Sequence, residues 1–246
     1  MTNQRKTYGL IGYPLSHSFS PNYFNRKFEQ ENIRADYRLF PLKNISEFPV
    51  LINKNPQIRG LNVTIPYKEL VIPYLDSLSE EAQEIGAVNT IVFSQNGLVG
   101  HNTDAVGFEK TLLTTPLQQN IKALIFGTGG ASKAVAFILK KHGINYQFIS
   151  RRKSPTTLSY TQLTTKIASS HMLWINTTPV GMSPNISDCL NLPFSSLTPN
   201  HIVIDLIYNP EITLLLKEAT QFGAITQNGL PMLHFQAENA WKLWNA

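Results

Sequence analysis

The sequence predicts an α/β protein of two domains, in which strands alternate with helices around largely parallel sheets. Short apolar runs rich in β-branched residues recur along the 246 residues, and segments with helical periodicity follow most of them. One such run, residues 121–126, leads directly into a glycine-rich turn and then a helix. The polar stretch 114–120 precedes it, and the chain is long enough for two medium-sized domains, so we expect the main boundary nearby.

The composition is that of a soluble globular protein, with 42% hydrophobic and 15% charged residues. The net charge of +5 is spread along the chain, apart from a cluster at residues 151–153 and a pair at 140–141. This pattern favours a bound anionic small molecule over nucleic acid. Cys189 is the only cysteine, so an internal disulfide is impossible, which fits a reducing cytoplasm. The histidines lack zinc-like spacing, and we recognise no signal peptide or membrane span.

Many of the expected elements are bounded by glycine, proline or a polar cluster, and Asn96-Gly97 marks a hairpin. We predict strands at residues 7–11, 36–41, 61–65, 86–93, 98–100, 121–126, 146–150 and 201–206, and one that starts at 173 and ends in a polar loop by 182. We predict helices at residues 22–32, 45–54, 68–75, 82–85, 104–113, 132–142, 212–222 and 232–244.

Lys68 is a candidate acid/base residue, because it follows a strand and is expected near the first turn of a helix. Unpaired amides give a helix N-terminus partial positive charge, so a partly buried lysine there should release its proton more easily. Such a lysine exchanges a proton with a substrate near neutral pH. Asp104 offers a carboxylate partner. A surface lysine and a helix-capping aspartate remain the alternative from these residues alone.

Three serines, Ser16, Ser18 and Ser20, follow the first strand at alternating positions. Their hydroxyls suit a polyhydroxy or carboxylate ligand. They are also ordinary turn and N-cap residues, and Ser20-Pro21 is a favourable start for a helix.

The segment Gly127-Thr128-Gly129-Gly130-Ala131-Ser132 lies between a strand and a helix, which is typical of a dinucleotide-binding turn. The strict GxGxxG fingerprint is not met, because Ser132 stands where the third glycine belongs. After the next strand, NAD-binding domains usually carry an acid, whereas this chain has Ser150-Arg151-Arg152-Lys153. Guanidinium groups bind a 2′-phosphate, so we expect NADP. A solvated basic loop is the alternative.

The polar loop at 177–182 follows a later strand of the same domain, where we expect contact with the nicotinamide half of the cofactor. The apolar and aromatic stripe of the last helix is expected to be core, and Gln236 is its polar exception.

Seven short motifs, taken together and in order, resemble the shikimate dehydrogenase family. The resemblance extends from Tyr8 to the last helix. The motifs are SHSFSP at 16–21, NVTIPYK at 62–68, GAVNT at 86–90, NTD at 102–104, GTGGAS at 127–132, NTTPVGM at 176–182 and GLPMLHFQA at 229–237.

The resemblance implies reversible, NADP-dependent reduction of 3-dehydroshikimate to shikimate, without a metal. It implies an N-terminal α/β substrate domain with a mainly parallel sheet, residues 1–103 with 229–246, and a Rossmann-like NADP domain, residues 104–228, with a cleft between them. It implies Lys68 as acid/base residue with Asp104 as partner. The implied substrate contacts are Ser18, Ser20, Asn62, Thr64, Asn89, Tyr208 and Gln236. The cofactor-binding candidates are Gly127, Gly129, Gly130, Ala131, Ser150, Arg151, Arg152, Thr177 and Gly229.

The chain departs from the family pattern where Ser150 replaces a common asparagine and Pro231 a common glycine. Three alternatives stay open: a quinate/shikimate dehydrogenase of broader specificity, a non-catalytic dinucleotide-binding regulator, and a folate-linked dehydrogenase of similar architecture. The partner is expected to be a small-molecule substrate, and the protein a cytoplasmic monomer or homodimer without nucleic-acid or membrane partners.

Overall fold

The structure is a computed structural model that describes residues 5–15, 18–151 and 153–246. The chain forms two compact units. Unit 1 comprises the chain up to Thr103 together with Ala237–Ala246, and unit 2 comprises Asp104–Gln236. The long C-terminal helix α8 (Leu230–Trp244) therefore contributes residues to both units. The family resemblance implies a return to the first domain at residue 229, before this helix begins.

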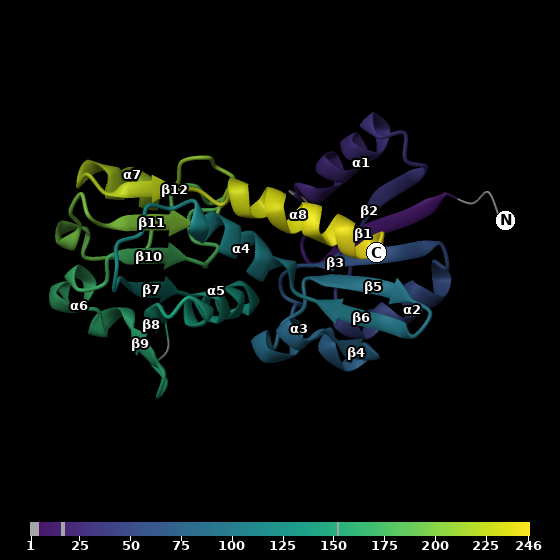
Figure 1. The fold of residues 1–246 in the computed structure, drawn as a ribbon, viewed down its shortest axis with the longest axis horizontal. Helices are drawn as coiled ribbons and strands as arrows, with labels where there is room; N and C mark the ends of the chain where they lie inside the picture. The colour runs from purple at the N-terminus through teal and green to yellow at the C-terminus, as the bar shows by residue number, and fades with distance from the viewer. Residues whose placement is uncertain (1–4, 16–17, 152) are drawn as a thin grey trace. The chain divides into compact units, whose positions relative to one another are not determined.

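Unit 1 is built on a six-stranded mixed sheet. β1 pairs in parallel with β2 on one side and β3 on the other, and β5 and β6 continue the sheet as an antiparallel hairpin (Figure 1). The strand order is β2 (Ala35–Pro41), β1 (Lys6–Gly12), β3 (Ile58–Val63), β5 (Thr90–Ser94), β6 (Gly97–His101) and β4 (Ser77–Leu78).

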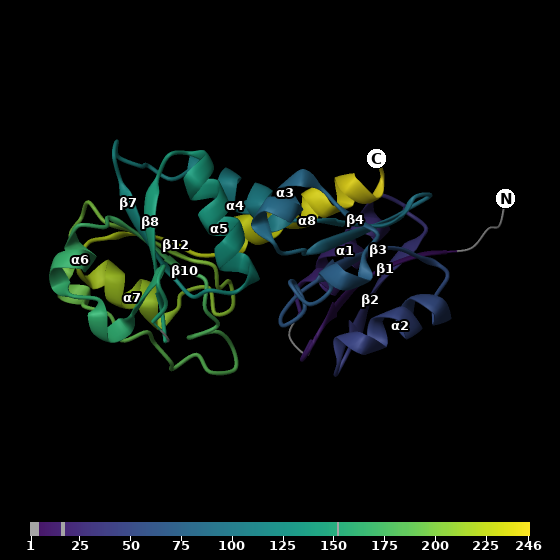
Figure 2. The same ribbon diagram turned by 90° about the horizontal axis from the view of Figure 1, so that it is seen from below.

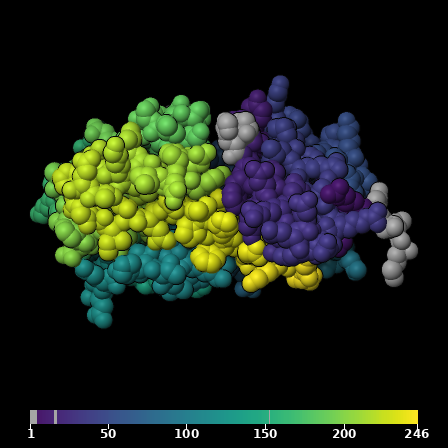
Figure 3. All heavy atoms as spheres, turned by 90° about the horizontal axis from the view of Figure 1, so that it is seen from above, coloured from purple at the N-terminus to yellow at the C-terminus, as the bar shows by residue number. Residues whose placement is uncertain are grey.

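Both faces of this sheet are covered, because successive residues of a strand point to opposite sides. Tyr8 of β1 belongs to a core cluster with residues of α1 (Ser20–Gln30) and α8, whereas Ile11 belongs to a second cluster with Phe48 of α2 (Phe48–Lys54). The second cluster also includes Ala82 of α3 (Glu80–Ile85). The C-terminal part of α8 and helix α1 lie next to each other at the surface (Figure 3).

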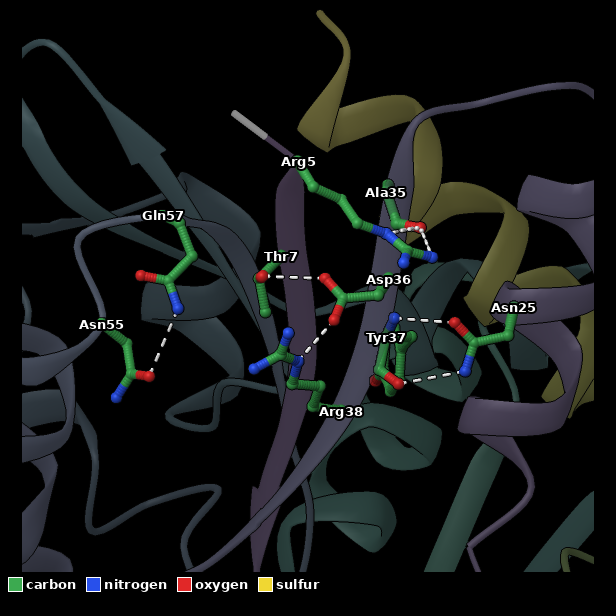
Figure 4. A network of polar contacts seen from close by, with 9 residues as sticks. All are labelled: Arg5, Thr7, Asn25, Ala35, Asp36, Tyr37, Arg38, Asn55 and Gln57. Carbon is green, nitrogen blue, oxygen red and sulfur yellow. Dashed lines mark hydrogen bonds and ion pairs between the residues drawn. The ribbon is translucent and has the colours of Figure 1, made fainter. Parts of the chain in front are cut away.

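Polar contacts fix the two N-terminal strands in register (Figure 4). Thr7 Oγ1 donates to Asp36 Oδ1 at 2.8 Å, and Asp36 also pairs with Arg38. Asn25 of α1 bonds to both main-chain groups of Tyr37, accepting from N at 2.8 Å and donating to O at 3.0 Å. Helix α1 therefore holds β2 at Tyr37.

Unit 2 is a six-stranded, wholly parallel sheet. Helices α4 (Thr103–Leu113) and α5 (Gly130–Lys141) lie on one face, and α6 (Thr165–Ser169) and α7 (Leu214–Gln221) lie on the other (Figure 2). The strand order is β12 (Ile225–Gln227), β11 (Ile202–Asp205), β10 (Leu173–Asn176), β7 (Lys122–Phe126), β8 (Asn145–Ser150) and β9 (Thr157–Ser159). The chain runs outward from β7 to β9 and then from β10 to β12, so the order reverses between β7 and β10. Ligands of such sheets bind at this reversal, beyond the carboxyl ends of the strands.

The α/β class and the mainly parallel sheets are confirmed, and several local predictions are wrong. The predicted helix at 68–75 is a run of turns followed by a 3-10 helix, Ile72–Tyr74. The predicted strand at 86–93 begins only at Thr90, because Gly86 ends α3 with a left-handed φ of 68°. The predicted helix at 45–54 starts as a 3-10 turn, Ile45–Glu47, and the short elements β4, β9, α6 and β12 were not foreseen.

Within the described part of the chain, no helix combines the length and apolar character that crossing a bilayer requires.

Candidate functional site

The substrate-side candidates of unit 1 are tied into one buried hydrogen-bond network. Tyr37 Oη donates to Asn62 Oδ1 at 2.7 Å. Asn62 Nδ2 lies 3.3 Å from Asn89 O and 3.2 Å from Thr90 Oγ1, so both of its protons have protein acceptors. Asn89 Oδ1 accepts from Thr90 Oγ1 at 3.0 Å and from Thr103 N at 2.7 Å. All five side chains are buried, so the network is fixed before any ligand arrives.

One of the candidate serines, Ser20, adjoins this network. Ser20 is half-buried at the start of α1 and shares a hydrogen bond with Tyr37. Burial raises the pKa of the Tyr37 phenol well above its ordinary value, and the bond with Ser20 offsets part of that rise. Tyr37 therefore stays protonated and donates at any physiological pH.

The second serine, Ser18, is bonded to Leu15, whose side chain lies with that of Thr64 beside Gly12. Ser18 Oγ donates to Leu15 O at 3.0 Å. A Cβ at Gly12 would lie 2.4 Å from Thr64 Cγ2 and 2.9 Å from Leu15 Cδ2, so Leu15 and Thr64 flank the same turn. Both Ser18 and Thr64 are half-buried. Ser16 lies outside the described residues.

The segments that carry Lys68 and precede Asp104 both bond to the chain around Asn89. Val88 N donates to Lys68 O at 2.7 Å, and Thr103 N donates to Asn89 Oδ1. Lys68 is half-buried, and it lies in a turn, so the helix N-terminus expected to act on its ammonium group is absent. Asp104 is 6% exposed and occupies the first turn of α4, where the helix dipole stabilises its negative charge.

The glycine-rich turn of unit 2 has the backbone that an anion-binding turn needs. Gly127 has φ of 109°, and a Cβ there would lie 2.7 Å from Thr177 Oγ1. Gly129 is the N-cap of α5, with no atom within 4 Å of a Cβ built on it. Gly130 is the first residue of α5. The amides at this N-terminus and the open space at Gly129 fit a pyrophosphate.

The residues after β8 fit a 2′-phosphate better than free ribose hydroxyls. Ser150 is half-buried and Arg151 is exposed. Burial raises the pKa of the Tyr160 phenol, and the positive charge of Arg151 offsets part of that rise. The sequence from Ser150 to Ser154 contains no acid. Arg152 lies outside the described residues.

The other unit 2 candidates follow the remaining strands. Thr177 donates from both N and Oγ1 to Phe126 O, at 2.9 and 2.7 Å, which joins the loop after β10 to the end of β7. Gly229 N donates to Ile207 O at 3.0 Å, beside Tyr208. A Cβ at Gly229 would lie 2.0 Å from Leu206 O. Gln236 Nε2 donates to Leu233 O at 2.8 Å within α8. In the described residues, His, Cys, Asp and Glu form no group of three that would hold a metal ion.

Comparison with known proteins decides the family. The chain is 39% identical to the curated NADP(+)-dependent shikimate dehydrogenase of Halothermothrix orenii, over 98% of this chain and 91% of that protein. The chain belongs to the shikimate dehydrogenase family. The family model described as the shikimate dehydrogenase substrate binding domain matches residues 10–91, which lie in unit 1.

Solved structures of the shikimate dehydrogenase family share the fold of this chain. Shikimate 5-dehydrogenase from Thermus thermophilus, in complex with NADP(H) and shikimate, matches with a TM-score of 0.86 and 31% identity, covering 97% of this chain and 93% of that one. Quinate dehydrogenase from Corynebacterium glutamicum, in complex with NAD, matches with a TM-score of 0.85 and 29% identity, covering 97% and 93%. The fold alone therefore does not separate shikimate from quinate or NADP from NAD.

The shikimate dehydrogenase resemblance did not single out Tyr37, Thr90 or Thr103, which complete the unit 1 network. Thr90 was visible within the GAVNT motif, and Thr103 within NTD. Tyr37 had no comparable signal, because an aromatic residue in a predicted strand is ordinary. Only the paired strands bring it next to Asn62.

Proposed function

We propose that this chain catalyses the reversible, NADP-dependent reduction of 3-dehydroshikimate to shikimate, in the cytoplasm, as a monomer or homodimer. The observation that carries the proposal is the near full-length match to the Halothermothrix orenii enzyme, in a chain that also has a basic, acid-free segment after β8. When bound, the cofactor supplies a hydride to the keto carbon. The described residues at the glycine turn and after β8 fit its pyrophosphate and 2′-phosphate.

Lys68 supplies the proton that the reduction requires. We assign to its ammonium group the donation of a proton to the alkoxide that develops on the former carbonyl oxygen. Asp104 orients Lys68 and accepts a hydrogen bond from a substrate hydroxyl. The support for this pairing is that segment 87–89 bonds both to the turn of Lys68 and to Thr103, which directly precedes Asp104.

The remaining side chains bind the substrate. Ser18 and Ser20 hold the carboxylate, and the polar groups of Thr64, Asn89, Tyr208 and Gln236 contact the rest of the molecule. For Asn62 the resemblance implies a substrate contact, and we assign it a different role. Its amide protons have protein acceptors, so we assign it the role of holding Asn89 and Tyr37 in place.

On the cofactor side, the glycine turn, Gly127 to Ala131, binds the pyrophosphate. Ser150, Arg151 and Arg152 bind the 2′-phosphate. Thr177 and Gly229 contact the nicotinamide half, since they lie on loops beyond the carboxyl ends of the strands.

The test is absorbance at 340 nm with purified protein and four pairs of reactants: shikimate or quinate with NADP⁺ or NAD⁺. Rapid NADPH formation from shikimate alone supports the proposal. Reaction with quinate and NAD⁺ would favour the activity named for the Corynebacterium glutamicum protein. No reaction with any pair, from folded protein that binds NADPH, would favour a non-catalytic role.

Arg151→Ala should raise the KM for NADP⁺ by about 10- to 100-fold, the effect of losing a charge-assisted hydrogen bond. The KM for NAD⁺, which lacks the 2′-phosphate, should stay within about twofold. Steady-state kinetics with each cofactor measure both values. Lys166→Ala, which removes another exposed cation of unit 2, serves as the control. Equal losses with the two cofactors would contradict the assignment.

Tyr37→Phe should raise the KM for shikimate by about tenfold, because it leaves Asn62 Oδ1 buried without its donor. The KM for NADP⁺ should remain unchanged, since the network lies wholly in unit 1. Tyr74→Phe removes a half-buried hydroxyl elsewhere in unit 1 and provides the matched control. A Tyr37→Phe enzyme with an unaltered KM for shikimate would show that the network does not position substrate groups.

A further inference from the structure

Asp205 is a fully buried carboxylate that the proposed chemistry does not use. It is the last residue of β11 and has no exposed surface. Oδ1 accepts from Asn176 Nδ2 at 2.9 Å and from Ile207 N at 3.1 Å, and Oδ2 accepts from Thr213 Oγ1 at 2.6 Å. All three donors are neutral, so the group acts here through hydrogen bonds. A buried carboxylate held only by neutral donors is costly, which points to a role beyond stability.

Each hydrogen bond that Asp205 accepts holds a different segment of the chain in place. Thr213 is the N-cap of α7, and Ile207 belongs to the exit from β11 that continues to Tyr208. Strand β10 lies next to β11 in the sheet (Figure 1). Asn176, the last residue of β10, is aligned with Asp205. Asn176 Oδ1 in turn accepts from Thr178 N at 3.0 Å and Thr178 Oγ1 at 2.7 Å. The carboxylate therefore reaches the loop after β10 through one amide side chain.

The chain of contacts continues to the glycine turn. Thr177, between Asn176 and Thr178, donates twice to Phe126 O. Its Oγ1 is also the atom nearest to a Cβ placed on Gly127. The loops after β7 and β10 are those that flank the reversal of strand order, where a dinucleotide binds.

We infer that Asp205 is a positioning residue for the cofactor, which sets the loop after β10 against the glycine turn through Asn176. It touches neither the cofactor nor the substrate. The inference rests on the proposed function, since it presumes that NADP(H) binds at this reversal.

Two substitutions at Asp205 separate hydrogen bonding from charge. Asp205→Ala removes every acceptor and leaves the Asn176, Ile207 and Thr213 donors without partners. Asp205→Asn keeps an oxygen for Asn176 and Ile207, and its amide can donate to the Thr213 hydroxyl, which is able to accept. A positioning role through hydrogen bonds is therefore rescued by asparagine, whereas a role for the charge is not.

The experiment is NADPH titration of the purified full-length variants, followed by the fluorescence of the nicotinamide. Asp205→Ala should raise the Kd for NADPH by about 10- to 100-fold, and Asp205→Asn by less than about threefold. In turnover, the KM for NADP⁺ should rise in parallel with the Kd. Asp188→Asn, at an exposed carboxylate of the same unit, is the control.

A second pair of variants, at Thr178, tests the inference even if Asp205→Ala fails to fold. Thr178→Val removes one donor to Asn176 and leaves the buried carboxylate intact, and Thr178→Ser restores the hydroxyl. We expect a rise of about three- to tenfold in the Kd for the valine variant only. Unaltered NADPH affinity in folded Asp205→Ala or in Thr178→Val overturns the inference, as does equal weakening by Asp205→Asn. If the wild-type protein itself fails to bind NADPH, the proposed function falls together with the inference.

Discussion

Replacement of Lys68 by alanine should lower kcat by about 10²- to 10⁴-fold, the usual contribution of a general acid. The KM for shikimate should change by no more than about threefold, since the carboxylate and hydroxyl contacts come from other side chains. Turnover falls because hydride transfer leaves a negatively charged oxygen that needs a proton, and we assign the donation of that proton to Lys68. Initial rates at saturating NADP⁺ measure both constants.

The matched variants are Lys68→Arg and Lys54→Ala. Arginine keeps the positive charge but does not release a proton at accessible pH, so Lys68→Arg should be nearly as slow as Lys68→Ala. Lys54 is an exposed lysine of the same unit, and its removal should leave kcat unchanged. A Lys68→Arg enzyme with wild-type turnover would reduce Lys68 to a binding cation and defeat the assignment.

The free energy of unfolding of unit 2 should fall by about 3 kcal/mol as Asp205 ionises. Burial raises the pKa of Asp205 from 3.8 to about 6, and the bonds from Thr213, Ile207 and Asn176 limit the rise. Between these two values the folded state binds more protons than the unfolded state, so stability is lost as pH rises. This contribution of Asp205 to the free energy of unfolding is fully present below pH 3.8 and is lost above about pH 6.

Asp205→Asn isolates this effect, because it lacks the titrating group. Amide hydrogen exchange of Val203 and Ile204 in β11 reports the opening free energy of this sheet. From about pH 4.5 to about pH 7.5, the wild-type value should drop by about 2 kcal/mol relative to the variant. The nearby Cys189 thiol stays neutral throughout, because burial and then Glu218 raise its pKa. Parallel pH profiles for the two proteins would contradict the raised pKa.

Much of the fold was predictable, because runs of apolar residues mark its strands and helices and turn residues mark where these end. The run at 121–126, the glycine turn and the following helix correspond to β7, the turn and α5. The short elements were missed for a physical reason. β4 has two residues and β12 has three, too few for a periodic pattern, and they form only because a neighbouring strand supplies partners.

The error at Lys68 had a visible cause. Leu70, Val71, Tyr74 and Leu75 have helical spacing, but Pro73 lies inside the predicted helix, where it removes a donor and clashes with the preceding turn. The chain accordingly forms turns and then a 3-10 helix that accepts the proline in its first positions.

The site was predictable only in part, since residue types reveal chemistry more readily than contacts. Asn62 and Asn89 were both expected to touch substrate, and sequence did not show that the amide protons of Asn62 have protein acceptors. Those acceptors belong to Asn89 and Thr90, which meet β3 only when the sheet forms.

The path of α8 has a consequence for biosynthesis. Trp244 stacks on Tyr8 with ring centroids 4.9 Å apart, donates Nε1 to Ile91 O, and occupies the space left by Gly60. A ribosome releases Tyr8 early and Trp244 only after all of unit 2. Until then, Trp244 cannot pack against the aromatic residues of β1 and α1. The nascent chain therefore completes its second unit before its first, and the sheet that is translated first matures last.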